Sequence, residues 1–212
     1  DGYTDVTAVT QFKRNGTHDN PLVLDGEELE LLTILLDGDD PEYSETKDIL
    51  TVDPKGKDSF TLTIQTRIKP EENTALEGLY KSGDMYATQC EAQGFRRITY
   101  YLDRPDVMTS FRVRIEADQS KYPILLSNGN PVDQGDLDEG RHFVTWEDPH
   151  KKPCYLFALV AGDLECRKDT FKTMSGRNVD LHIYVRKGDI DQTEWAMDSL
   201  KRCMKWDEER FG

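Results

Sequence analysis

Gln89 and Glu91 are the residues of this sequence whose types and spacing best suit a binding site for a cation. They stand two positions apart in the segment A-T-Q-C-E-A (residues 87–92), so in an extended chain both side chains point to the same side. The carboxylate supplies charge and the amide oxygen supplies direction, and together they can receive an ammonium group. Spacing alone leaves a second interpretation open, in which the pair lies on a solvated strand face.

Other residue types that carry chemistry lack a diagnostic arrangement. The sequence contains no H-E-x-x-H, no Walker loop, no G-x-G-x-x-G and no G-x-S-x-G. One histidine lies in a turn, one lies beside prolines, and two lie in strand-like segments, so a strand side chain is the simpler interpretation of these last two. No spacing predicts the three or four converging ligands of a zinc site. The four histidines are His18, His142, His150 and His182.

Carboxylates are too common in this acidic sequence to mark a catalytic pair by themselves. Asp103 and Asp106 flank Arg104-Pro105, which is typical of a turn with local ion pairs. A complete hydrolase that works through two carboxylates is one alternative function, but no pair in the sequence is singled out enough to support it.

The composition indicates a polar globular protein large enough for one large all-β domain or two small ones. Acidic residues outnumber basic residues by 41 to 27 in a chain of 212 residues, which gives a formal charge of -14. Such a surface repels nucleic-acid phosphates and anionic membranes. No apolar run approaches the ~20 residues of a membrane helix, and residues 1–3 do not begin a signal peptide. We expect a cytoplasmic protein that binds neither nucleic acid nor membranes.

The cysteines and the start of the chain give two further expectations. No pair of cysteines has C-x-x-C spacing, so we expect reduced thiols, buried or half-buried, with disulfides as the alternative. The chain lacks an initiator Met and a strand pattern begins almost at once, so we expect it to be cut from a longer protein. The cysteines are Cys90, Cys154, Cys166 and Cys203.

Most of the sequence has strand patterns. Residues 59–68 alternate most regularly, which predicts a half-buried antiparallel strand. Asn128-Gly129 predicts the tight turn of a hairpin over residues 124–132. Residues 69–94 lose the regular pattern and predict a long, ordered loop of the kind that is often functional. The other predicted strands are residues 5–12, 21–24, 28–36, 110–117, 141–147, 155–162, 171–173 and 179–185.

The last segment predicts a helix over residues 191–212. Asp191 and Glu194 fit an acidic variant of the capping box, and Gly212 is suited to end the helix. An apolar stripe at helical spacing, flanked by two tryptophans, predicts the buried face. Its residues are Ala196, Leu200, Cys203 and Met204.

Several motifs, taken together, closely resemble the N-terminal domain of the bacterial aminopeptidase N family. The members of this family are gluzincin-type zinc aminopeptidases. The resemblance covers nearly the whole chain in order and is least distinctive over the first dozen residues. The motifs are N-T-A-L-E-G-L-Y (73–80), T-Q-C-E-A (88–92), G-F-R-R-I (94–98), Y-L-D-R-P-D-V (101–107), L-S-N-G-N (126–130), K-P-C-Y-L-F-A-L-V-A-G-D (152–163) and M-K-W-D-E-E-R-F-G (204–212).

The resemblance implies a mostly β fold: a saddle-like antiparallel β domain over residues 1–190, then a helix over residues 191–212 that begins an absent thermolysin-like catalytic domain. It implies that Glu91 contacts the free α-amino group of a peptide and that Gln89 lines the pocket for the first side chain. Peptide N-termini and the chain's own catalytic domain are the implied partners. Zinc is implied for the full-length enzyme only, so the fragment alone would hold no metal or catalytic residue and would be inactive.

One alternative function and one structural expectation complete the sequence analysis. The alternative function is a free-standing β-sandwich module that binds carbohydrate or peptide. Such a module needs an exposed aromatic platform, whereas Trp146 and Tyr155 lie in core-like patterns. The chain starts after the family's first strand, so we expect an unpaired sheet edge at which the fragment could dimerise.

Overall fold

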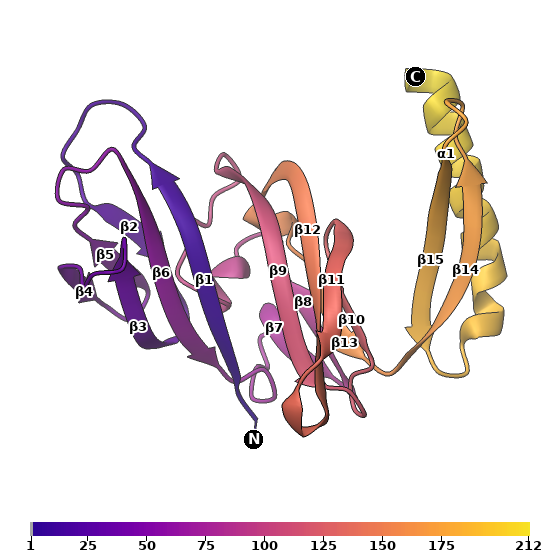
Figure 1. The fold of residues 1–212 in the computed structure, drawn as a ribbon, viewed down its shortest axis with the longest axis horizontal. Coiled ribbons are helices and arrows are strands. Elements are labelled where there is room, and N and C mark those ends of the chain that lie inside the picture. Colours follow the sequence, from indigo (N-terminus) through magenta and orange to yellow (C-terminus); the bar gives the residue numbers. More distant parts are fainter. Residues whose placement is uncertain (1) are drawn as a thin grey trace.

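The computed structural model describes residues 2–212 and consists mainly of antiparallel strands, with one long helix at the end of the chain (Figure 1). Within these residues the strands form five sheets, and all pairings between strands are antiparallel. The predicted fold class, mostly β with a C-terminal helix, is confirmed.

Two sheets make up the first part of the molecule and share one hydrophobic core. Buried side chains from both sheets, among them Leu24, Leu50 and Leu62, form this core. The larger sheet has the order β1 (Thr4–Lys13), β6 (Ser59–Ile68), β3 (Glu30–Leu36), and the smaller has the order β2 (Leu22–Asp25), β5 (Ile49–Val52), β4 (Tyr43–Glu45). β6 has the bounds and the alternating burial predicted from the sequence, whereas β4 and β5 were not predicted.

Two further sheets form the middle of the molecule. Ile115, Leu125 and Ala161 come from both sheets and are buried together between them. One sheet has the order β10 (Ile124–Ser127), β13 (Leu159–Gly162), β8 (Met85–Gln89), β7 (Gly78–Ser82), and the other has the order β11 (Asn130–Asp136), β12 (Arg141–Pro153), β9 (Met108–Asp118). A short 3-10 helix, η1 (Phe95–Arg97), follows β8, and η2 (Asp138–Gly140) and η3 (Cys154–Leu156) precede and follow β12.

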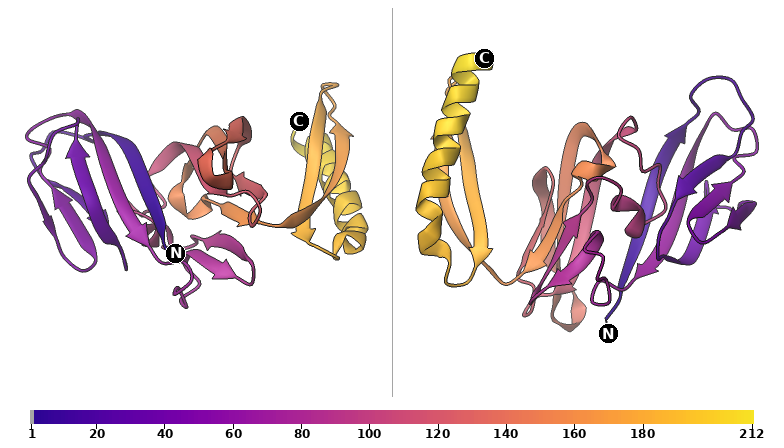
Figure 2. Two further views of the ribbon diagram at one scale, coloured as in Figure 1. Left: turned by 60° about the horizontal axis from the view of Figure 1, so that its bottom comes forward. Right: turned by 180° about the vertical axis from the view of Figure 1, so that it is seen from behind.

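The hairpin of β14 (Leu164–Lys172) and β15 (Asn178–Arg186) packs against the 3-10 helix η4 (Ile190–Thr193). Polar contacts of Asp169 and Met174 also join it to helix α1 (Glu194–Phe211). This unit stands apart from the four sheets in all three views and is joined to them by one segment of chain (Figures 1 and 2). No helix among residues 2–212 is both long and apolar enough to cross a membrane.

Two predictions, one of a hairpin and one of a long loop, were wrong. β10 and β11 do not form a hairpin around Asn128-Gly129, because β10 pairs with β13 and β11 with β12. The Asn128 side chain donates to the Leu156 carbonyl and accepts from the Ala158 amide, so the turn leads the chain from one sheet to the other. Residues 69–94 are not one loop. They contain the hairpin β7–β8, closed by Gly83 at φ 62 in a two-residue turn.

The helix prediction was partly wrong. Gly212 caps the C-terminal end of α1 as expected, but the N-cap is Thr193, which makes no side-chain cap hydrogen bond, so the capping box does not form. Of the predicted stripe, Ala196, Leu200 and Cys203 are exposed, because the face toward the hairpin carries Met197 instead. Cys203 is therefore not one of the buried or half-buried thiols that were expected.

Candidate functional site

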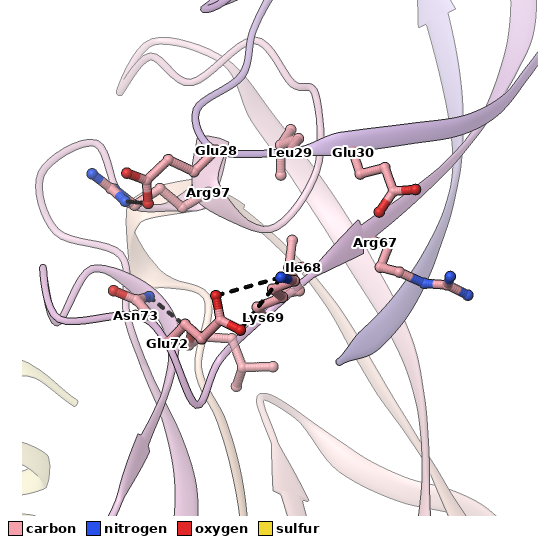
Figure 3. Close-up of a pocket in the computed structure, with 10 residues that line it drawn as sticks. Glu28, Leu29, Glu30, Arg67, Ile68, Lys69, Glu72, Asn73 and Arg97 are labelled. Carbon is pink, nitrogen blue, oxygen red and sulfur yellow. Dashed lines mark hydrogen bonds and ion pairs between the residues drawn. The ribbon is translucent and has the colours of Figure 1, made fainter. Parts of the chain in front are cut away.

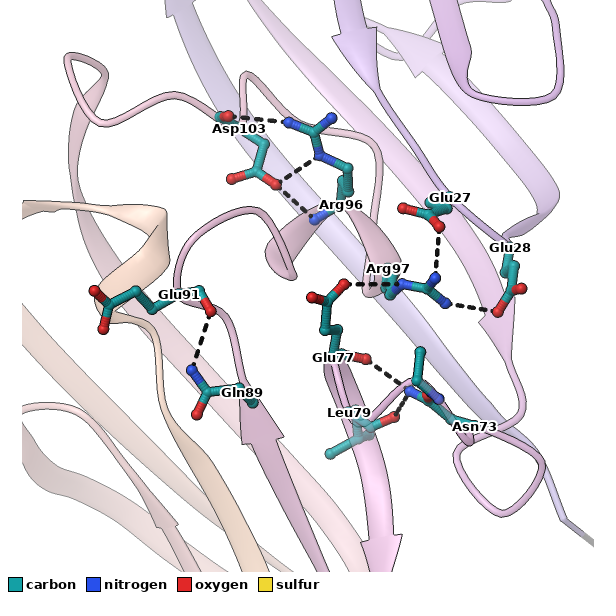
Figure 4. Close-up of polar contacts among 11 residues, drawn as sticks. Glu27, Glu28, Asn73, Glu77, Leu79, Gln89, Glu91, Arg96, Arg97 and Asp103 are labelled. Atoms are coloured by element: carbon teal, nitrogen blue, oxygen red, sulfur yellow. Dashed lines mark hydrogen bonds and ion pairs between the residues drawn. The ribbon is translucent and has the colours of Figure 1, made fainter.

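Gln89 and Glu91 lie where strand β8 ends and a turn begins. Both are exposed, whereas Cys90 between them is buried and 2% accessible, so the alternation expected of an extended chain is present. Figure 4 shows both side chains pointing to the same side, away from Arg97. The structure thus brings together an amide and a carboxylate on one exposed surface, as the spacing predicts.

The two side chains keep their acceptor atoms available. The Gln89 side-chain amide donates to the Glu91 backbone carbonyl over 3.1 Å, and this contact orients the amide nitrogen toward the Glu91 backbone. Within residues 2–212, neither the Gln89 amide oxygen nor the Glu91 carboxylate has a hydrogen-bond or ion-pair partner. The peptide bond between Glu91 and Ala92 is cis. Two acceptors at one strand end suit a ligand that donates several hydrogen bonds and carries positive charge.

The turn after Glu91 closes tightly on the two strands that precede it. The Gly94 amide donates to the Cys90 carbonyl over 2.9 Å. A Cβ at Gly94 would lie 2.3 Å from the Gln89 carbonyl oxygen and 2.9 Å from the Gly78 nitrogen, closer than real contacts allow. Glycine is therefore required for this close approach, which fixes the backbone around Glu91.

Arg97 anchors the far end of the same turn among carboxylates. Its guanidinium pairs with Glu27 at 2.5 Å, with Glu28 at 2.7 Å and, more loosely, with Glu77 at 3.7 Å. Asn73 then donates to the backbone carbonyl of Glu77 over 2.7 Å (Figure 4). The turn is thus tied to the segment before β3 and to the start of β7.

Asp103 lies in the interior of the protein and binds Arg96, the residue of the turn just before Arg97. One of its carboxylate oxygens accepts from the Arg96 backbone amide at 3.2 Å and from Arg96 Nε at 2.9 Å. The other accepts from the Cys154 thiol at 3.1 Å. The expected local ion pair exists only at Asp106, which pairs with Arg104 at the surface. Asp103 instead takes part in a buried network that the sequence pattern did not predict.

The two buried thiols, Cys90 and Cys154, are unreactive core residues. Burial raises the pKa of Cys90 to about 12, and the charge of Asp103 adds to this. Burial, and then the hydrogen bond to Asp103, raise the pKa of Cys154. Both thiols therefore stay neutral at pH 7 and pack as small apolar groups.

The described residues do not fit a zinc site. No group of three or more His, Cys, Asp and Glu side chains is placed to hold a metal ion in the part of the chain that the structure describes. His142 is buried in β12 and contacts the Tyr122 carbonyl at 2.8 Å, whereas His18, His150 and His182 are exposed.

A cavity of about 440 Å³ lies beside this region but does not include Gln89 or Glu91. Figure 3 shows acidic and basic side chains around it, with Glu72 next to Lys69. Two of its basic residues already have partners: Arg67 pairs with Asp5, and Arg97 pairs with its glutamates. The candidate site is therefore the exposed end of β8 and not this cavity.

The fold defines the class of protein. The structure is similar to the crystal structure of Legionella pneumophila aminopeptidase A in complex with aspartic acid, with a TM-score of 0.92 and 36% identity over 98% of this chain and 25% of that chain. It also shares its fold with an M1 zinc metallopeptidase from Deinococcus radiodurans, with a TM-score of 0.74 and 18% identity over 88% of this chain and 44% of that chain. The chain therefore has the fold of the β domain seen in these two peptidase structures.

Residues 4–156 match the family model of the peptidase M1 N-terminal domain. The chain belongs to this family, and the resemblance seen in the sequence is confirmed. It is 56% identical over 211 residues to aminopeptidase N of Escherichia coli (strain K12) and 53% identical over 212 residues to aminopeptidase N of Caulobacter vibrioides. Each match covers 99% of this chain and 24% of the relative, so the chain spans about a quarter of the length of these proteins.

Proposed function

We propose that this chain is the substrate-anchoring domain of a zinc-dependent aminopeptidase that releases N-terminal amino acids from peptides. Membership of the peptidase M1 N-terminal domain family supports the reaction class, and the similar proteins from Escherichia coli and Caulobacter vibrioides are named aminopeptidase N. The observation that carries the proposal is the unpartnered Glu91 carboxylate beside the Gln89 amide oxygen, at the exposed end of β8.

Glu91 accepts the α-ammonium group of the substrate in this proposal. An aminopeptidase must distinguish a terminal ammonium from the uncharged amides inside a peptide, and a carboxylate makes that distinction by charge and hydrogen bonding. Its position is set by the closed turn between Cys90 and Gly94. A carboxylate at a fixed position determines how far the N-terminus of the substrate peptide extends into the site.

Gln89 contributes to the pocket for the first side chain. Its amide group is oriented by the hydrogen bond to the Glu91 carbonyl, so its oxygen and the Glu91 carboxylate face the same surface (Figure 4). The zinc site and the catalytic residues belong to the rest of the enzyme in this proposal. The 212-residue chain alone is therefore expected to be inactive.

A carbohydrate-binding platform is less well supported. Trp146 is half-buried and donates from its indole nitrogen to the Leu125 carbonyl, so it belongs to the packing between two sheets. The more exposed tryptophans, Trp195 and Trp206, lie on helix α1 and not on a sheet face.

Replacement of Glu91 tests the proposal. In the full-length enzyme, Glu91→Ala is expected to lower kcat/KM for an aminoacyl-anilide by about a hundredfold or more, because the ammonium loses its charged partner. Steady-state kinetics measure this, with Glu165→Ala, a change at a glutamate of the distant hairpin, as control. A decrease smaller than about threefold would refute the role of Glu91.

A further inference from the structure

Asp103 is an almost fully buried carboxylate, with 2% of the residue accessible. Three donors converge on it: the Arg96 backbone amide, Arg96 Nε and the Cys154 thiol. Arg96 Nη2 also donates to the Asp103 backbone carbonyl over 3.3 Å. A buried carboxylate is costly unless its acceptors are satisfied and its charge is paired, and this arrangement meets both conditions.

Arg96 transmits this restraint to the turn that carries Glu91. Its backbone carbonyl accepts from the Glu27 amide over 3.0 Å, and its guanidinium approaches Asp25 at 3.6 Å. Arg96 is thus held at its amide, its carbonyl and its side chain. The Gly94 amide, bonded to the Cys90 carbonyl, closes the short segment that contains Glu91, and Gly94 lies two residues before Arg96.

The restraint connects parts of the fold that are far apart in sequence. Cys154 lies in η3 after β12, Asp103 follows the isolated bridge between Asp25 and Tyr101, and Arg96 lies in η1. Asp103 is the one side chain among residues 2–212 that bonds both the turn and η3. It therefore links the turn directly to η3.

We propose that Asp103 is a positioning residue for substrate anchoring: through Arg96 it holds the turn of residues 91–97 so that the Glu91 carboxylate stays in register with the substrate ammonium. This inference rests on the proposed function of Glu91. An asparagine at position 103 keeps the shape but loses the charge and one acceptor, so Arg96 is held less firmly. The turn then samples several positions, and the ammonium contributes less to binding.

The test compares two inhibitors of the full-length enzyme, leucine hydroxamate and its des-amino analogue 4-methylpentanehydroxamate. The ratio of their inhibition constants measures what the amino group contributes to binding. Asp103→Asn is expected to reduce this ratio by about tenfold and to raise KM more than it lowers kcat. Asp106→Asn is the matched control, since it removes an exposed carboxylate three residues away, and it should leave the ratio unchanged.

A second variant guards against a simple loss of folding. Arg96→Lys keeps the charge but loses the guanidinium contacts to Asp103, and it should reduce the ratio by a smaller factor than Asp103→Asn. Thermal melting identifies the temperature at which each variant is folded, and the inhibition constants are measured there. Should Asp103→Asn fail to fold, Arg96→Lys alone decides the outcome.

The outcomes separate the two proposals. If Glu91→Ala itself leaves the ratio unchanged, the anchoring function fails and the role of Asp103 fails with it. If Glu91→Ala abolishes the amino preference but the folded Asp103→Asn and Arg96→Lys variants retain it, only the positioning role is overturned. A parallel decrease in affinity for both inhibitors would mark Asp103 as a structural residue and would also overturn the inference.

Discussion

The exposure of Glu91 depends on the residue before it. Cys90 is buried with Phe95 and Cys154 in one core cluster, and burial raises the pKa of its thiol to about 12, so it enters the core as a neutral group. In an extended segment the flanking side chains must then face outward. The strand end therefore presents Gln89 and Glu91 to solvent on one side, which is the arrangement used in the proposed ammonium site.

At the residue scale, a change at Gln89 separates binding of the substrate ammonium from preference for the first side chain. Gln89→Ala in the full-length enzyme is expected to lower kcat/KM less than Glu91→Ala does, because no charge is lost. It should change the order of preference among aminoacyl-anilides with small, branched and basic side chains, since in the proposed site the first side chain of the substrate lies against Gln89. Kinetics on a panel of such substrates measure the effect. An unchanged order of preference would show that Gln89 does not line the pocket.

At the scale of elements, the site depends on how the turn after β8 meets the start of β7. Gly78 has a φ of 71, and a Cβ there would lie 2.7 Å from the Arg97 Cβ. Gly94 faces it with ordinary helical backbone angles. The two glycines let the turn pack against the hairpin, and the ion pairs of Arg97 then hold it there.

The packing of this turn predicts the effect of one added methyl group. Gly94→Ala is expected to destabilise the protein by about 1–3 kcal/mol, because its Cβ would overlap backbone atoms of Gln89 and Gly78. Gly135→Ala is the control, since its Cβ would meet only the Phe143 ring at 3.1 Å. Urea unfolding of the two variants measures the difference. Equal midpoints would contradict the close packing described for the turn.

At the scale of the whole molecule, the hairpin β14–β15 and helix α1 behave as one unit. Arg167 bonds Thr193 at 2.6 Å near the helix start, Lys201 pairs with Asp169 midway, and Glu208 accepts from the Met174 amide near the end. The domain boundary between residues 190 and 191 stays a prediction. The hairpin packs with the helix, which favours a boundary near Asp163 instead.

This division predicts a local response to a core mutation in α1. Met197 is 4% accessible, and Met197→Ala should cost about 2–5 kcal/mol within the unit. Hydrogen exchange should therefore accelerate in α1, β14 and β15 and stay unchanged in β1 and β6. Trp206→Ala, at a residue that is 59% accessible, should leave all of these rates unchanged. Faster exchange throughout the sheets after Met197→Ala would show that the molecule unfolds as one unit.

The sequence alone determined the local features of this protein. Regular alternation in β6 predicted both its bounds and its buried face, because side chains on a strand must alternate. The same rule placed Gln89 and Glu91 on one side of the chain. The motifs identified the family, and the family model and relatives confirm it.

Tertiary structure decided which strands pair, which face of the helix is buried and which partners the two aspartates contact. Asn128-Gly129 signals a reversal, but the Asn128 contacts to residues 156–158 send the strands to different sheets. Most of the predicted apolar stripe of the helix is exposed, and packing buried Met197 instead. Asp103 and Asp106 look alike in sequence, yet one meets Arg96 and Cys154 in the interior and the other meets Arg104 at the surface. Contacts between segments that are distant in sequence determine all three outcomes, and the local spacing of residues does not encode such contacts.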